Sequence, residues 1–190
     1  MTHPARATSV ADPDYGGVSS AGQSSGELRT ERLRLVTLTP GLVRSALEDR
    51  EELGHKLQAR VPPSWPGADF ARMLPSLADG PDDTSVAAPT RLIVHAANRT
   101  VIGETGFHGP PDRSGTVEIG YSIVLEYRGR GFASEATRAL IEAAFSSPGI
   151  RRIIAECLED NGASLRVLEK LGMRRTRSAG DTVHFELRRP

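Results

Sequence analysis

The sequence predicts a single α/β domain with a mixed, mostly antiparallel sheet and helices on both of its faces. Three observations indicate this class. Segments with strand spacing alternate with segments of helical spacing, three strands follow one another closely in the middle of the chain, and a helix separates the last of these from another strand. Closely spaced strands pair antiparallel, whereas a strand–helix–strand crossover joins parallel neighbours. The length of 190 residues fits one domain.

The first segment is predicted to be a disordered extension covering residues 1–26, followed by the folded domain at residues 27–190. The extension is rich in Ala, Ser, Gly and Pro and holds too little apolar surface to pack. It also lacks the apolar stretch of a signal peptide.

The first half of the domain is predicted to hold one strand and two helices. Apolar and polar residues alternate over 33–37, which indicates a strand, and a helix is expected from Pro40 through Leu57. Three prolines make 61–66 a loop. A second helix is expected over 68–77, and a polar loop over 80–89.

The second half is predicted to begin with strands at 91–96, 101–107 and 116–125. A helix over 131–145 follows, because its apolar residues fall on one face. The segment 152–158 is apolar on both faces apart from Glu156, as in a central strand. A short helix over 161–171 stops at Gly172, and 182–188 is expected to be the final edge strand.

Composition excludes several classes of protein. Lys plus Arg and Asp plus Glu number 24 each, so the chain lacks the basic excess that bulk nucleic-acid binding needs. Cys157 is the only cysteine, which excludes an internal disulfide. No stretch approaches the ~20 apolar residues of a membrane helix, and the histidines show no metal-ligand spacing. We therefore expect a cytoplasmic protein without a metal, nucleic-acid or membrane partner.

The sharpest local signal is the segment Arg128-Gly129-Arg130-Gly131-Phe132-Ala133, which lies between a predicted strand and a predicted helix. Glycines there let the backbone approach a ligand, and the N–H groups of the first helical turn attract phosphate oxygens. Taken alone, the pattern fits a tight turn with a solvated arginine pair equally well. It lacks the Lys-Ser/Thr ending of a Walker loop and the spacing of the dinucleotide fingerprint.

The segment Arg128-x-x-Gly131-x-Ala133 resembles the pyrophosphate-binding signature Gln/Arg-x-x-Gly-x-Gly/Ala of the GNAT superfamily of acyl-CoA N-acyltransferases. Three further parts of the chain are similar to the ribosomal-protein N-terminal (RimJ/RimL-like) acetyltransferase subgroup. They are Thr30-Glu31-Arg32-Leu33-Arg34-Leu35, Glu118-Ile119-Gly120-Tyr121, and Asn161-x-x-Ser164 with Glu169-Lys170-Leu171-Gly172-Met173. The resemblance spans about residues 28–186.

The resemblance implies a GNAT fold in which the fourth and fifth predicted strands splay apart and acetyl-CoA lies in the wedge between them. Pantetheine would pair with the fourth strand, and backbone N–H groups of residues 129–134 would hold the pyrophosphate. Asn161 would touch the cofactor arm, although Asn is also a preferred helix N-cap. The implied cofactor-binding residues are Ile123, Arg128, Gly129, Arg130, Gly131, Phe132, Ala133, Ser134 and Asn161.

Amine acetylation needs a base, because free amines are protonated near neutral pH. The resemblance assigns that role to Glu118, with Glu156 as the second candidate. An ion pair with a neighbouring arginine is the structural alternative for each. Many relatives protonate the leaving thiolate with a tyrosine at a position that is Leu168 here, and the closer subgroup suggests Ser164 instead. A serine in a first helical turn also has a purely local use.

Trp65, the only tryptophan, lies in the proline-rich loop, which in this superfamily lines the acceptor site. It would wall a pocket for the acceptor or, alternatively, pack against the sheet. The expected activity is transfer of acetyl from acetyl-CoA to a primary amine, either a protein N-terminal α-amine or a small molecule. The alternative from another class is a catalytically weak acyl-CoA-binding sensor module. Relatives often form homodimers, so a homodimer is possible here.

Overall fold

The computed structural model describes residues 27–78 and 90–190. The expected extension at 1–26 and the whole of the expected loop at 80–89 lie outside these residues. The elements are β1 (Leu28–Arg29), β2 (Leu33–Thr37), α1 (Pro40–Glu48), α2 (Arg50–Leu57), α3 (Ala68–Ala78), β3 (Arg91–His95), β4 (Thr100–Phe107), β5 (Thr116–Ile123), the 3₁₀ turn Leu125–Tyr127, α4 (Phe132–Ser146), β6 (Arg152–Leu158), α5 (Gly162–Lys170), β7 (Arg174–Ala179) and β8 (Thr182–Arg188).

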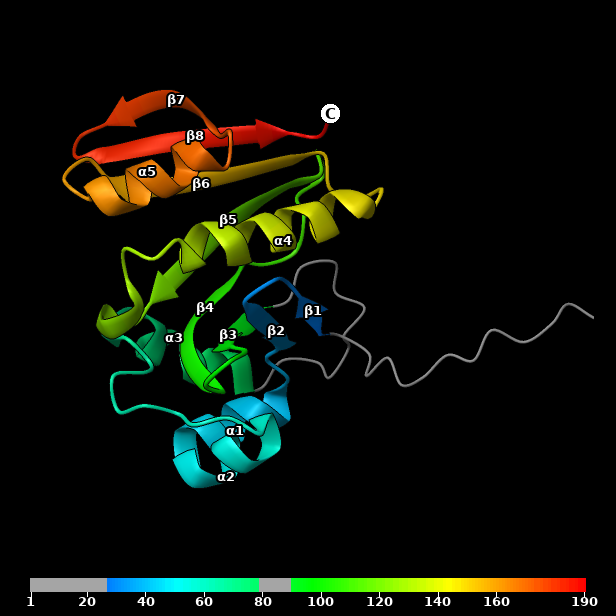
Figure 1. The fold of residues 1–190 in the computed structure, drawn as a ribbon. Helices are drawn as coiled ribbons and strands as arrows, with labels where there is room; N and C mark the ends of the chain where they lie inside the picture. Colours follow the sequence, from blue (N-terminus) through cyan, green and yellow to red (C-terminus); the bar gives the residue numbers. More distant parts are fainter. Residues whose placement is uncertain (1–26, 79–89) are drawn as a thin grey trace, which may run out of the picture.

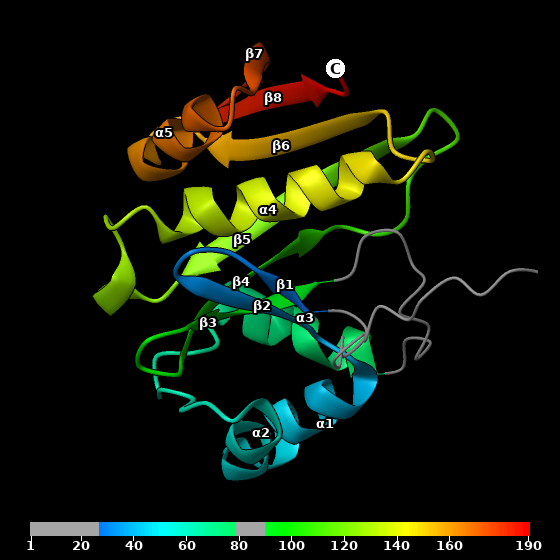
Figure 2. The same ribbon diagram turned by 45° about the vertical axis from the view of Figure 1, so that its right-hand side comes forward.

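The strands form one open sheet in the order β1-β2-β3-β4-β5-β6-β8-β7. Among the strands of residues 27–78 and 90–190, only β5 and β6 pair in parallel, because the crossover helix α4 joins them, and the other pairs are antiparallel. Helix α4 crosses one face of the sheet, and α3 lies behind the opposite face (Figure 1, Figure 2). The predicted mixed, mostly antiparallel sheet with helices on both faces is confirmed.

The apolar core has two parts, and α4 contributes to both. Phe132 and Ala136 at the start of α4 join the cluster built on β2, β3, β4 and the first three helices. Leu140, Ile141 and Ala144, further along the same helix, join the cluster of β5, β6, β8 and α5. Over residues 27–78 and 90–190, no helix combines the length and the apolar character that crossing a bilayer requires.

Two predicted elements differ from the structure. The single helix expected from Pro40 through Leu57 is broken at Asp49, whose backbone is extended and whose side chain caps α2 by accepting from the N–H groups of Glu51 and Glu52. The segment 182–188 is not an edge strand, because β7 covers it on the outer side. Every residue of β7 is exposed, so that strand has no apolar alternation by which it could be predicted.

Strands β5 and β6 pair only at their first residues, Thr116–Glu118 against Arg152–Ile154. Both strands continue well beyond this contact, β5 to Ile123 and β6 to Leu158, without a further pair between them. They therefore open into a wedge toward their carboxyl ends. This is the splay that the sequence predicts for the fourth and fifth strands, which become β5 and β6 because the short β1 precedes them.

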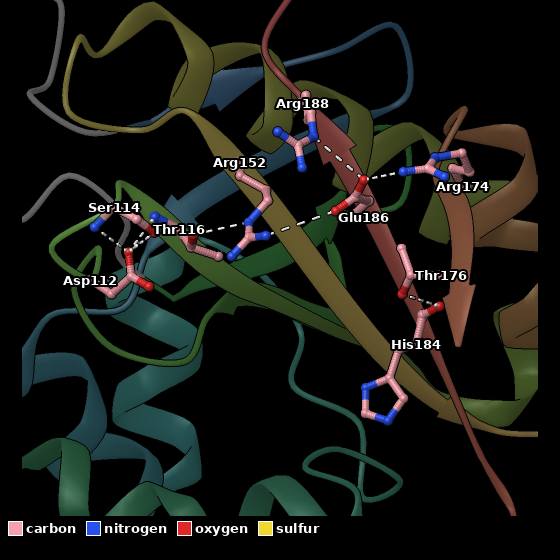
Figure 3. Close-up of polar contacts among 9 residues, drawn as sticks. All are labelled: Asp112, Ser114, Thr116, Arg152, Arg174, Thr176, His184, Glu186 and Arg188. Atoms are coloured by element: carbon pink, nitrogen blue, oxygen red, sulfur yellow. Dashed lines mark hydrogen bonds and ion pairs between the residues drawn. The ribbon is translucent and has the colours of Figure 1, made fainter. Parts of the chain in front are cut away.

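A polar network holds the closed end of this wedge (Figure 3). Arg152 on β6 donates from Nε to the hydroxyl of Thr116 on β5 at 3.1 Å and faces Glu186 on β8 at 3.9 Å. The Glu186 carboxylate is only 9% exposed and also binds Arg174 and Arg188, which lower its pKa. The network ties β5, β6 and β8 together at the end where β5 and β6 are still paired.

Candidate active site

The turn between β5 and α4 presents unsatisfied backbone donors. Gly129 and Gly131 have φ of +73° and +82°, a left-handed conformation that favours glycine. Gly131 is the N-cap of α4 and has no side chain to accept from the first helical turn. The positions where a Cβ of Gly129 would lie are open. These residues fit a pyrophosphate, because the free N–H groups and the positive dipole end of α4 lie beside an unobstructed glycine backbone.

A clamp consisting of Thr30, Arg32 and Glu135 holds this turn from the other side. Arg32 donates from Nε to Glu135 Oε2 at 2.7 Å and from Nη1 to the Arg130 carbonyl at 3.1 Å. Thr30 donates its hydroxyl to Glu135 at 2.5 Å. Burial opposes the charge on Glu135, but these bonds lower its pKa overall. The guanidinium also stacks on Phe132, 4.5 Å from the ring centroid.

The wedge edge of β5 is reached by Arg128. The N–H of Val124 donates to Ile102 on the β4 side, so the backbone groups of Ile123 point to the opposite edge, into the wedge. Arg128 Nε donates to the Ile123 carbonyl there at 2.7 Å. The predicted pantetheine contact at Ile123 therefore requires Arg128 to release this carbonyl or to share it.

On the α4 side of the wedge, a tyrosine lies beside the predicted acid. The Tyr121 hydroxyl on β5 is 2.8 Å from Ser164 Oγ on α5. Burial raises the pKa of Tyr121 to about 12, which keeps the phenol protonated. Leu168, which occupies the position of the relatives' tyrosine, is buried. Asn161 caps α5 by accepting from the Ser164 N–H at 3.1 Å, as the structural alternative predicts.

The opposite face of β5 carries Glu118, Gly120 and Ser122, because strand residues alternate between faces. The Glu118 side chain is 35% exposed and lies 3.2 Å from Nδ1 of His108. A Cβ at Gly120 would meet the same imidazole at 2.8 Å. The His108 imidazole thus fills the space beside Glu118 and Gly120. We call this side the acceptor face.

Glu156 also lies on the acceptor face, as the alternation along β6 requires. Its side chain is 42% exposed and bonds Nδ1 of His184 at 2.7 Å. Although the rest of β6 is largely apolar, as in a central strand, the Glu156 carboxylate is therefore not buried. Neither Glu118 nor Glu156 pairs with an arginine of the described residues; each faces a histidine instead.

Trp65 is almost completely buried, with 1% of its surface exposed. Its indole Nε1 donates to Glu104 Oε2 on β4 at 2.8 Å. Glu104 is itself 4% exposed, and the Ser122 hydroxyl is its second hydrogen-bond partner. Burial raises the pKa of Glu104 to about 7, against the effect of these two bonds. The tryptophan packs against the sheet and reaches the acceptor face through this carboxylate.

Sequence reasoning missed Glu104 and Tyr121. The signal for Glu104 was present, since it is the lone charge in the run Val101-Ile102-Gly103-Glu104-Thr105. A carboxylate in such a strand is costly unless it has partners or a function. The signal for Tyr121 was its position on the strand before the glycine turn, on the face opposite to Glu118 and Gly120. Among the residues that the structure describes, no group of three or more His, Cys, Asp or Glu could hold a metal.

The raised pKa of Glu104 makes stability depend on pH. The folded protein favours the neutral acid, so this stabilisation is complete below about pH 4.5 and is lost as the pH rises through about 7. The interval between these values corresponds to about 3 kcal/mol at most. We expect Glu104→Gln, which stays neutral, to be more stable than the wild type at pH 8.5 by up to this amount and not at pH 5. Urea unfolding at both pH values measures it; an equal difference at the two would contradict it.

Comparison with known proteins identifies the family. The model of the acetyltransferase (GNAT) domain matches residues 32–174. The uncharacterized N-acetyltransferase YjdG of Bacillus subtilis (strain 168) is 31% identical over 160 residues, which cover 83% of this chain and 95% of that protein.

Two solved structures share the fold. One is the ribosomal-protein-S5-alanine acetyltransferase of Vibrio fischeri, with a TM-score of 0.57, 15% identity and coverage of 86% of this chain and 96% of that one. The other is the microcin C7 self-immunity acetyltransferase MccE, in complex with acetyl-CoA and AMP, with a TM-score of 0.58, 16% identity and coverage of 87% and 97%. With the matching family model, the wedge and the glycine turn, this chain belongs to the GNAT family of acetyl-CoA-dependent acetyltransferases.

Proposed function

We propose that this acetyltransferase transfers the acetyl group directly to a primary amine, first of all the α-amine of a protein N-terminus. The observation that carries the proposal is the arrangement around the wedge. Phosphate-binding donors lie at one end of the wedge, and exposed carboxylates lie on the acceptor face beside it. Negative side chains there suit the ammonium form in which amines arrive.

Glu118 removes the first proton from the arriving ammonium, directly or through water. Its carboxylate is accessible, and His108 orients it. Glu156 with His184 is the second candidate for this role. A base at this point is required because only the neutral amine can attack the thioester.

Ser164 donates a proton toward the departing sulfur, and Tyr121 supplies the tyrosine hydroxyl that Leu168 cannot. The 2.8 Å contact between the two hydroxyls supports this pairing. A protonated phenol at that point replenishes the serine. The backbone donors of residues 129–134, together with Arg128 and Arg130, hold the pyrophosphate of acetyl-CoA, and Asn161 lies at the opposite wall.

A panel assay for free thiol tests the function. The purified protein is incubated with acetyl-CoA and peptides beginning with Ser, Ala or Met, and separately with polyamines, amino acids and aminoglycosides. We expect saturable thiol release with the peptides, and a product heavier by one acetyl group. Release with a small amine alone would place the acceptor in the second class. Tight acetyl-CoA binding by calorimetry, with no release for any amine, would favour the sensor alternative.

A further inference from the structure

Glu104 is a buried carboxylate that the proposed transfer does not yet use. It lies on β4 with 4% of its surface exposed, and the described residues offer it no ion-pair partner. Its hydrogen bonds come from the Trp65 indole at 2.8 Å and from the Ser122 hydroxyl. A carboxylate held by two neutral donors in the interior can take up a proton at little cost.

Ser122 connects this carboxylate to the open part of the wedge. It lies directly across from Glu104 in the β4–β5 ladder, and it immediately precedes Ile123. Ser122 and Ile123 lie beyond the paired residues Thr116–Glu118, in the part of β5 that has separated from β6. Ser122 is half-buried, whereas Glu104 is closed off. The hydroxyl is therefore the point at which the buried acid meets the wedge.

Acetylation of an ammonium removes two protons from the nitrogen, one before attack and one as the amide forms. Glu118 lies at the paired end of β5, four residues before Ser122, and serves the first. We propose that Glu104 accepts the second proton through the Ser122 hydroxyl. This inference rests on the proposed function and extends it.

The step balances. The nitrogen lone pair forms the new N–C bond, the C–S bond breaks, and sulfur leaves with its electron pair. The nitrogen proton passes to Ser122 Oγ while the hydroxyl proton of Ser122 passes to Glu104. The sulfur takes its proton from Ser164 or solvent, and Glu104 later returns its proton to solvent by the same route.

The charges around Glu104 leave it free for this exchange. Arg50, at the start of α2, donates its guanidinium to the carbonyls of Pro62 and Trp65 in the loop that carries Trp65. On β3, the residue across from Glu104 is the apolar Leu92. On β5, Glu118 is engaged with His108. On α3, Asp69 and Arg72 bind each other at the surface. A pKa of about 7 suits a group that takes and returns a proton near neutral pH.

The test compares Glu104→Gln with Glu118→Gln between pH 6.5 and 9.5, on a peptide with a free α-amine that the wild type acetylates. Glutamine still accepts from the Trp65 indole, so the fold is kept. We expect Glu104→Gln to lower kcat by about 10²-fold with little change in acetyl-CoA affinity. This loss should persist at pH 9.5, where an α-amine arrives neutral, whereas the loss in Glu118→Gln should shrink there.

Ser122→Ala and Trp65→Phe are the matched controls. Ser122→Ala should reproduce the loss, and the double variant should be no worse than either single one, because one relay is removed twice. Trp65→Phe removes only the indole bond and should lower kcat by less than about 10-fold. If Glu104→Gln keeps wild-type kcat at neutral pH, or if its effect is reproduced by Trp65→Phe, the relay is wrong. In either case acetyl transfer by the wild type leaves the proposed function standing, whereas a wild type that acetylates no amine overturns that function itself.

Discussion

Glu118→Gln is expected to lower turnover at neutral pH by about 10²–10⁴-fold, the usual contribution of a general base. Glutamine keeps the shape and can still bond His108, so acetyl-CoA affinity should stay nearly constant. An α-amine has a pKa of about 8. The loss should therefore shrink as the pH rises past that value and the amine arrives neutral. Initial rates of thiol release, measured as a function of pH with saturating acetyl-CoA, provide the test.

Glu156→Gln is the matched control, because it removes a carboxylate that also bonds a histidine on the same face. We expect a smaller loss from it. Full turnover of Glu118→Gln at pH 7, with chemistry limiting the rate, would remove Glu118 from the mechanism. A large loss in Glu156→Gln alone would transfer the role to that residue.

Gly131→Val is expected to weaken acetyl-CoA binding by about 10- to 100-fold. A β-branched residue at a φ of +82° is strained by about 1–2 kcal/mol. The new side chain would also stand where phosphate oxygens approach the first turn of α4. Its Cβ would lie 3.5 Å from Arg32, an ordinary contact, so the core remains intact. Titration calorimetry with CoA measures the affinity.

Gly180→Val serves as the control for backbone strain. Gly180 also has a positive φ, +59°, with open space around the Cβ position, but it lies in the turn between β7 and β8. It should lower the melting temperature without changing CoA affinity. Unchanged affinity in a folded Gly131→Val protein would argue against pyrophosphate binding at this turn.

Much of the fold could be predicted because the residues that pack the core recur with regular spacing. The apolar face of α4 and the alternation of β2 are examples. The break at Asp49 was missed because its cause is one side chain capping the next helix within a helical pattern. Strand β7 was missed because all of its residues are exposed, so its pairing with β8 leaves no mark on hydrophobicity.

The site was less predictable, since its chemistry depends on partners distant in sequence. The glycine turn is local and could be read directly. The side chains that bond to each carboxylate are distant from it in the sequence. Trp65 meets Glu104, and His184 meets Glu156, because the fold brings their segments together. The exposure of Glu156 in an otherwise apolar segment could not be predicted from that segment alone. The His108 imidazole beside Gly120 comes from the end of a neighbouring strand and is likewise not predictable from β5.

The short seam between β5 and β6 has a mechanical consequence. Among the described residues, the ladder between β5 and β6 consists of Thr116–Glu118 and their partners Arg152–Ile154, and beyond it the two strands separate. An acetyl-CoA molecule bound in the wedge would contact both strands and so link β5 to β6 where they do not pair. Saturating CoA should therefore slow amide hydrogen exchange in β5 and β6, which border the wedge, more than in the distant β2 and β3.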